Sequence, residues 1–121
     1  MLWPAYVAIA LVIGGCNKGG SDSSVLKPKQ AASTLEQAFG KANEEIKNTA
    51  SLATDALRTA DYEKAVVSLG VLRARPDLSV QQQMAVQESE ATLTSMLVTA
   101  MDAGDAKAKQ AYEMLKRSKR D

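Results

Sequence analysis

Few side chains in this chain of 121 residues are suited to catalysis or to metal binding. It contains no histidine and a single cysteine, Cys16, which removes the usual zinc ligand sets, Cys–His pairs, Ser-His-Asp triads and internal disulfides. Two acidic pairs, Glu44 with Glu45 and Glu88 with Glu90, have the carboxylates that acid–base catalysis or a hard cation requires. Neither pair has the spacing of a calcium loop, and no glycine turn accompanies them. The sequence therefore predicts no enzyme, no cofactor and no metal site.

The charges of the chain are nearly balanced. Lys and Arg number 15 and Asp and Glu 14, for a formal net charge of +1. Nucleic-acid binding depends on a surplus of phosphate-neutralising cations, so no nucleic-acid partner is predicted. Residues 77–105 carry five acidic side chains and no Lys or Arg. Glu88 and Glu90 at the centre of this stretch are a candidate face for a basic partner, with a solvated acidic face as the alternative.

The N-terminal stretch is apolar and uncharged. Residues 1–13 read MLWPAYVAIALVI, which is shorter than the roughly 20 apolar residues that a helix needs to cross a membrane. This length is typical of the hydrophobic region of a secretory signal peptide. An aliphatic residue, two small residues and the cysteine follow one another here, and they resemble the lipobox of bacterial lipoproteins in the order Ile13, Gly14, Gly15, Cys16.

The lipobox resemblance implies a cellular location for the protein. It implies cleavage before Cys16, which becomes a triacylated N-terminus, and more than one acyl chain at about 0.8 kcal/mol per buried CH₂ gives a stable anchor. In some Gram-negative bacteria Asp directly after the cysteine retains a lipoprotein at the inner membrane. Asn17 stands there instead, which by resemblance favours the outer membrane, facing the periplasm. Residues 1–4 contain no Lys or Arg, so either the α-amino group supplies the positive charge of the signal or the true start lies upstream.

Two other interpretations of this end of the chain stay open: an uncleaved apolar helix with an inert Cys16, and a plain secreted protein cleaved nearby. Under the lipoprotein hypothesis the chain divides into a signal peptide (residues 1–15), a lipidated N-terminus with a flexible linker (16–32) and an α-helical domain (33–121). The linker is rich in Gly, Ser and Lys. Such a composition buries too little apolar surface to offset the entropy lost on ordering.

Helices are predicted throughout residues 33–121. Ser33 and Glu36 have the spacing of a capping box and predict a helix start. Either one helix or two occupies the region up to residue 60, because Gly40 can break the helix and Asn43 can begin another. Apolar residues recur here at steps of three and four, the pattern of a buried helical stripe: Leu35, Phe39, Ala42, Ile46, Ala50, Ala53 and Leu57.

Three further helix starts are predicted from capping residues, at Asp61, at Ser79 with Gln82, and at Asp105 after Gly104. Gly70 lies inside the helix that begins at Asp61, where it costs about 1 kcal/mol relative to Ala. The expected reason is the close approach of another backbone. No segment has the alternation of a strand, so the fold is predicted to be all-α.

One pair of helices has a familiar pattern. Residues 52–76 resemble a tetratricopeptide-type helical hairpin in Ala53, in Asp61 and Tyr62 at the turn, in Ala65 and in Leu69. The resemblance implies an antiparallel hairpin in which Ala53 packs against Ala65, extended by one or two further helices. A generic amphipathic hairpin is the alternative, because only one such repeat is present and repeat arrays need about three.

These observations predict a lipid-anchored envelope protein whose helical module mediates protein–protein interaction or scaffolding. Its predicted partners are the lipid bilayer, through acylated Cys16, and another envelope protein or a second copy of itself. The alternative is an accessory subunit or inhibitor that regulates an envelope enzyme through Glu88 and Glu90.

Overall fold

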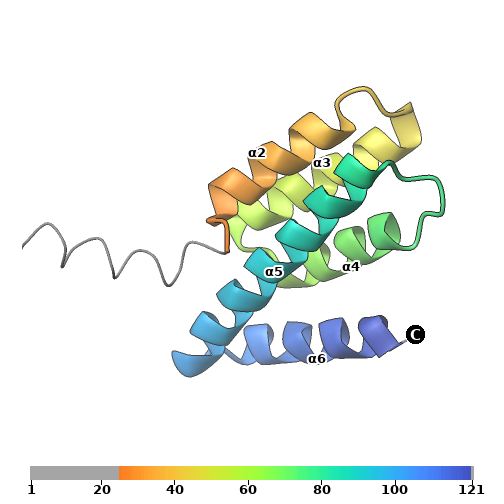
Figure 1. The fold of residues 1–121 in the computed structure, drawn as a ribbon. Coiled ribbons are helices and arrows are strands. Elements are labelled where there is room, and N and C mark those ends of the chain that lie inside the picture. Colours follow the sequence, from red (N-terminus) through yellow and green to blue (C-terminus); the bar gives the residue numbers. More distant parts are fainter. Residues whose placement is uncertain (1–24, 121) are drawn as a thin grey trace, which may run out of the picture.

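A computed structural model describes residues 25–120 of the chain. These residues form only helices and connecting turns, which confirms the prediction of an all-α fold. The helices are α2 (Pro28–Phe39), α3 (Glu44–Thr59), α4 (Tyr62–Arg73), α5 (Val80–Asp102) and α6 (Ala106–Arg120) (Figure 1).

Four of the helices close into a ring, and the fifth packs outside it. Helix α3 packs against α2 and α4, and the long α5 packs against both α2 and α4. Helix α6 turns back from the end of α5 and packs against α4 and α5 (Figure 1). Two hydrogen bonds set the direction of α5 against α2. The Gln82 amide donates to the Ala38 carbonyl at 3.2 Å, and the Thr92 hydroxyl donates to the Leu26 carbonyl at 2.7 Å, so these two helices are antiparallel.

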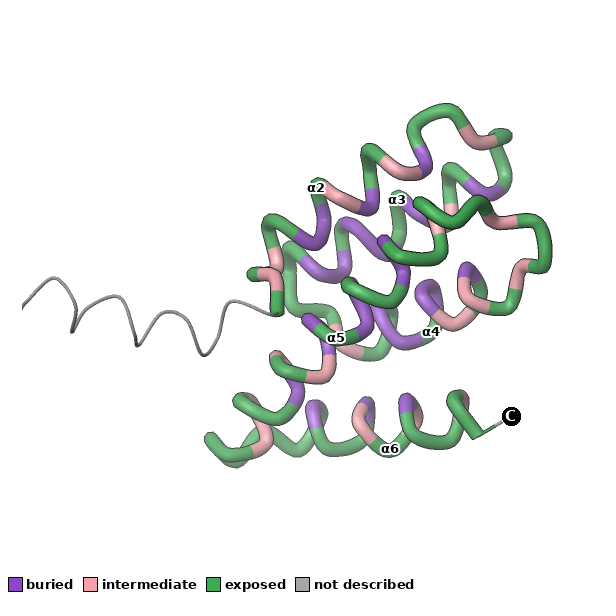
Figure 2. Tube along the Cα trace, in the orientation of Figure 1, coloured by how far each residue is buried: buried purple, intermediate pink, exposed green. Residues whose placement is uncertain are grey.

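The core is aliphatic and rich in alanine, with Phe39 as the one phenylalanine of the chain. Each helix contributes one buried face, which Figure 2 shows in purple along the inner sides. Small residues allow the helix backbones to approach closely, while leucines fill the interior. The largest fully buried apolar side chains are Phe39, Leu35, Leu57, Leu69, Leu72, Leu93, Leu97 and Val86.

The start of the first described helix was predicted wrongly. Ser33 does not cap a helix but lies exposed within α2, which begins five residues earlier at Pro28. Residues 28–32, expected in the flexible linker, are helical because proline suits the first helical position and because Ala31 and Ala32 are fully buried. The Gln30 side chain accepts from the Lys27 backbone N–H at 3.2 Å, on the N-terminal side of the helix.

The helix starts predicted at Asp61, Ser79 and Asp105 are confirmed, and the alternative left open before residue 60 is decided. Two helices occupy the region before residue 60, separated after Gly40, and Asn43 caps the second by accepting from the Ile46 N–H at 3.0 Å. Capping by Asp61, Ser79 and Asp105 is present as predicted. Each of these side chains accepts from a backbone N–H of the first turn, at 3.3 Å, 3.1 Å and 2.9 Å respectively.

Within residues 25–120, no helix combines the length and the hydropathy needed to cross a membrane.

The explanation expected for Gly70 is wrong, since a Cβ built there meets no atom within 4 Å. We therefore expect Gly70→Ala to raise the free energy of unfolding by up to about 1 kcal/mol, because alanine loses less backbone entropy in a helix. Urea denaturation followed by circular dichroism measures the change. Gly104→Ala is the contrasting variant: Gly104 has φ of 91°, so alanine there is strained and the free energy should fall. Equal effects of the two substitutions would contradict this explanation.

Candidate functional site

The residues predicted for lipidation and signal cleavage, Ile13, Gly14, Gly15 and Cys16, lie outside the described residues. The predicted site residues that the structure does place are on α3, α4 and α5. They comprise the acidic pair of α5 and the four positions assigned to packing of the helical hairpin.

Glu88 and Glu90 do not form one exposed face. Residues two apart on a helix point about 200° from one another, so only one of the two carboxylates points outward. Glu88 is exposed, whereas Glu90 is 5% exposed and faces inward. The prediction of a joint docking face is therefore wrong, because burial of Glu90 removes its charge from the surface.

Glu90 is instead part of a polar cluster that joins three helices. Its carboxylate pairs with the guanidinium of Arg73 on α4. The same guanidinium donates to the Ser118 carbonyl of α6 at 3.1 Å and to the Ser118 hydroxyl at 3.3 Å. Sequence reasoning could not find this cluster, because Glu90 and Ser118 lie 17 and 45 positions from Arg73. The role of this cluster is structural: the buried Glu90 carboxylate is paired with the Arg73 guanidinium, which also hydrogen-bonds to Ser118.

Other acidic side chains also have partners. Asp77 accepts from Arg75 at 3.3 Å, and this hydrogen bond lowers the pKa of the Asp77 carboxyl below its ordinary value. Asp105 caps α6, while Glu44 and Glu45 are exposed in the first turn of α3. Among the residues that the structure describes, no three acidic or cysteine side chains cluster in a way that suits a metal ion.

One buried polar atom on α5 lacks a partner. The Ser89 hydroxyl is fully buried and makes no hydrogen bond within the described part of the chain. Since an unsatisfied buried hydroxyl is costly, we expect Ser89→Ala to raise the free energy of unfolding by about 1 kcal/mol. Chemical denaturation gives this value. The matched change Ser95→Ala, at an exposed position of the same helix, should alter stability by less than about 0.5 kcal/mol. A lower stability of Ser89→Ala would show that the hydroxyl does find a partner in solution.

The residues assigned to hairpin packing are mostly in the core. Ala53, Ala65 and Leu69 are buried, on α3 and α4. Tyr62 is half-buried and lines two surface grooves. One groove is also lined by the segment around Val25 and by α5, and the other is also lined by α6. Burial of the two alanines meets one requirement of a close helix crossing.

A surface groove of about 660 Å³ lies between α4 and α6. Val67 and Val71 stand on its α4 side and remain 53% and 48% exposed, one helical turn apart. Gly70 between them adds no side chain, so the floor stays open. The lining comprises Val66, Val67, Gly70, Val71, Arg73, Ala74, Met114, Ser118 and Lys119.

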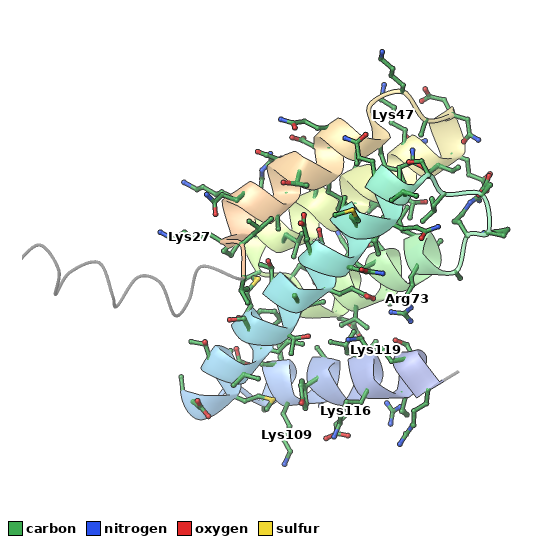
Figure 3. The ribbon with its side chains drawn as sticks, viewed as in Figure 1. Lys27, Lys47, Arg73, Lys109, Lys116 and Lys119 are labelled. Atoms are coloured by element: carbon green, nitrogen blue, oxygen red, sulfur yellow. The ribbon has the colours of Figure 1, made fainter. Side chains whose placement is uncertain are left out.

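Within the described residues, the groove combines exposed apolar side chains with one unpaired cation, Lys119, because the guanidinium of Arg73 is already paired with Glu90. Arg73 and Lys119 are its charged lining residues, and Figure 3 labels both, on facing helices. Exposed apolar side chains in a concave surface are a feature of helix-binding grooves. Sequence reasoning missed this groove, although two valines four residues apart and off the core stripe of α4 were an available signal.

Comparison of the chain with protein-family models, curated proteins and solved structures gives no match.

Proposed function

We propose that this chain is a lipid-anchored bacterial lipoprotein whose helical domain binds a helix of another envelope protein in the groove between α4 and α6. The observation that carries the binding proposal is the exposure of Val67 and Val71 beside Gly70 in this groove. Burial of these apolar side chains releases the most free energy when a partner side chain fills the open floor of the groove.

The anchoring proposal is supported by the lipobox-like residues Ile13, Gly14, Gly15 and Cys16. Eleven residues separate Cys16 from Pro28, where α2 begins. A fully extended chain of that length spans at most about 40 Å. Acylation of Cys16 would therefore hold the helical domain close to a bilayer without any spanning helix, most favourably the periplasmic side of the outer membrane because Asn17 follows the cysteine.

We extend the proposal to the hairpin of α3 and α4, which we interpret as tetratricopeptide-like. Ala53 and Ala65 are buried as that family requires, and Ala60, in the turn, has the left-handed φ of 56° that a glycine would adopt more easily. The interpretation covers one hairpin only. Because α5 packs against α2 as well as α4, the helices close a ring instead of continuing an open stack.

The chemistry of the groove favours an amphipathic partner helix with acidic residues beside its apolar stripe. Apolar residues of such a helix would contact Val67 and Val71, and its carboxylates would approach Lys119. Regulation of an enzyme through the acidic residues of α5 finds no comparable support, because the Glu90 carboxylate is buried against Arg73.

Site-specific photo-crosslinking tests the binding proposal. A photoreactive residue at position 71 should give a discrete adduct in the envelope, and Val67→Glu should abolish this adduct by placing a charge in the apolar floor. The control position is Val80, which is 73% exposed at the start of α5 and outside the groove. Mass spectrometry of the linked peptide should identify an acidic amphipathic helix.

Three results would contradict the proposal. Equal adducts from positions 71 and 80 would indicate unspecific contact, and no adduct from position 71 would indicate an empty groove. An adduct of twice the mass of the chain would replace the proposed partner with a second copy of this protein.

A further inference from the structure

Helix α6 carries a concentrated positive charge. Six of its fifteen residues are Lys or Arg and one, Glu113, is acidic, for a net charge of +5. The rest of the described chain, residues 25–105, has eight basic and eleven acidic residues, for a net charge of −3. The net charge of the chain is therefore close to zero although α6 is strongly basic and residues 25–105 are acidic.

Four of the six basic residues of α6 lie on its outer side. Ala108, Ala111 and Leu115 face the bundle and are buried. The opposite face follows the helical repeat and contains Lys109, Glu113, Lys116, Arg117 and Arg120, all exposed. Figure 3 shows Lys109 pointing away from the other helices.

Little within the fold neutralises this face. The ion pair that the structure gives α6 joins Lys116 to Glu113 at 3.5 Å, and the Lys116 ammonium also lies 5.1 Å from the centre of the Tyr112 ring. Among residues 25–120, the other ion pairs join α2 to α3, α4 to α5, and residues near the ends of α3 and α4. Lys109, Arg117 and Arg120 remain available to an external anionic surface.

We propose that this basic face of α6, defined by Lys109, Lys116, Arg117 and Arg120, binds the anionic headgroups of the bilayer to which the chain is anchored. The inference rests on the anchoring at Cys16 proposed above. Each Lys or Arg near an anionic membrane surface contributes about 1 kcal/mol, and the attraction extends over about one Debye length of 10 Å.

The position of the tether favours lipid over other anionic partners. Val25 and Ala103, the residue after α5, line the same groove, so the chain that leads toward Cys16 enters near the start of α6. Only eight residues, 17–24, lie between Cys16 and Val25, a span of at most about 29 Å. Anchoring at Cys16 thus keeps the basic face at a high local concentration near the headgroups, whereas a soluble polyanion must diffuse to it.

The test uses the full chain, extracted from membranes and reconstituted in vesicles, with a fluorophore on the variant Gln110→Cys. Gln110 is exposed on α6, and energy transfer to labelled headgroups reports how often the basic face is at the surface. Vesicles of phosphatidylcholine are compared with vesicles in which about a third of the lipid is phosphatidylglycerol. Transfer should rise on the anionic vesicles and fall again when salt is raised to about 1 M, where the Debye length is about 3 Å.

Two variants that each lose four positive charges show which residues cause the increase in energy transfer. Substitution of the four basic residues to Gln should lower the surface-binding equilibrium constant at least tenfold on anionic vesicles. The control replaces four exposed lysines elsewhere with Gln, Lys29, Lys41, Lys47 and Lys64, and should lower the constant less than twofold. Circular dichroism confirms that both variants keep their helices.

Failure of this inference can be distinguished from failure of the anchoring proposal. If Cys16 is acylated, Gln110→Cys supplies the sole free thiol and one label is incorporated, whereas two labels would show that the anchoring proposal is wrong. With one label, equal transfer on neutral and anionic vesicles, or equal losses in the two variants, would overturn the proposed lipid contact. Release of α6 by polyglutamate at a charge concentration below that of the lipid would reassign the surface to an acidic protein.

Discussion

Arg73→Met is expected to lower the free energy of unfolding by about 3 kcal/mol, the cost of leaving a buried carboxylate without its cation. Glu90 is 5% exposed, so its charge has almost no access to water once the guanidinium is removed. Methionine keeps much of the volume of arginine, which limits any cavity contribution to the loss. The same change also removes the two contacts of Arg73 with Ser118 of α6. Urea denaturation of the full chain measures the effect.

The double variant Arg73→Met with Glu90→Met should recover most of this loss, because replacing both partners of a buried ion pair with apolar residues is often neutral or stabilising. Glu88→Gln is the matched control on the same helix, since Glu88 is exposed, and it should change stability by less than about 0.5 kcal/mol. Additive losses in the double variant would contradict the pairing of Arg73 with Glu90.

Phe39→Ala is expected to lower the free energy of unfolding by about 3 to 4 kcal/mol, the combined cost of lost apolar burial and of the cavity left behind. Phe39 is 1% exposed at the end of α2 and is the largest fully buried side chain among the described residues. Thermal or urea denaturation followed by circular dichroism gives the value.

Leu52→Ala serves as the control for this prediction, because Leu52 is 48% exposed on α3. The control should cost less than about 1 kcal/mol. A loss from Phe39→Ala no greater than that from Leu52→Ala would show that Phe39 is not part of the core in solution.

The helical fold was predictable because its signals are local. A capping side chain satisfies N–H groups a few residues away, so Asp61, Ser79 and Asp105 indicated their helices directly from the sequence. Asn43 indicated a helix start only as one of two alternatives. The start of α2 was missed because Ser33 and Glu36 matched a capping box, while burial of Ala31 and Ala32 against other helices extended the helix backwards. Such burial depends on tertiary packing, and a segment of small residues indicates it only weakly.

The candidate site was less predictable, since it depends on contacts between distant segments. Glu90 was assigned to an acidic surface by the charge of its neighbours, but its partner Arg73 lies on another helix. Gly70 was assigned to a close helix contact, yet the space beside it is open and forms part of the groove between α4 and α6. In both cases the residue type indicated an unusual environment, and only the packing of α4 against its neighbours showed which one.

The most direct test of the proposed anchoring is the intact mass of the protein extracted from membranes, compared with that of the Cys16→Ser variant. Lipid anchoring predicts a chain that begins at residue 16 and is heavier than its polypeptide by a diacylglycerol and an amide-linked acyl group, and it predicts that the variant lacks this addition. An unmodified chain of full length, identical in processing to the variant, would contradict the lipoprotein assignment and with it the proposed contact of α6 with the bilayer.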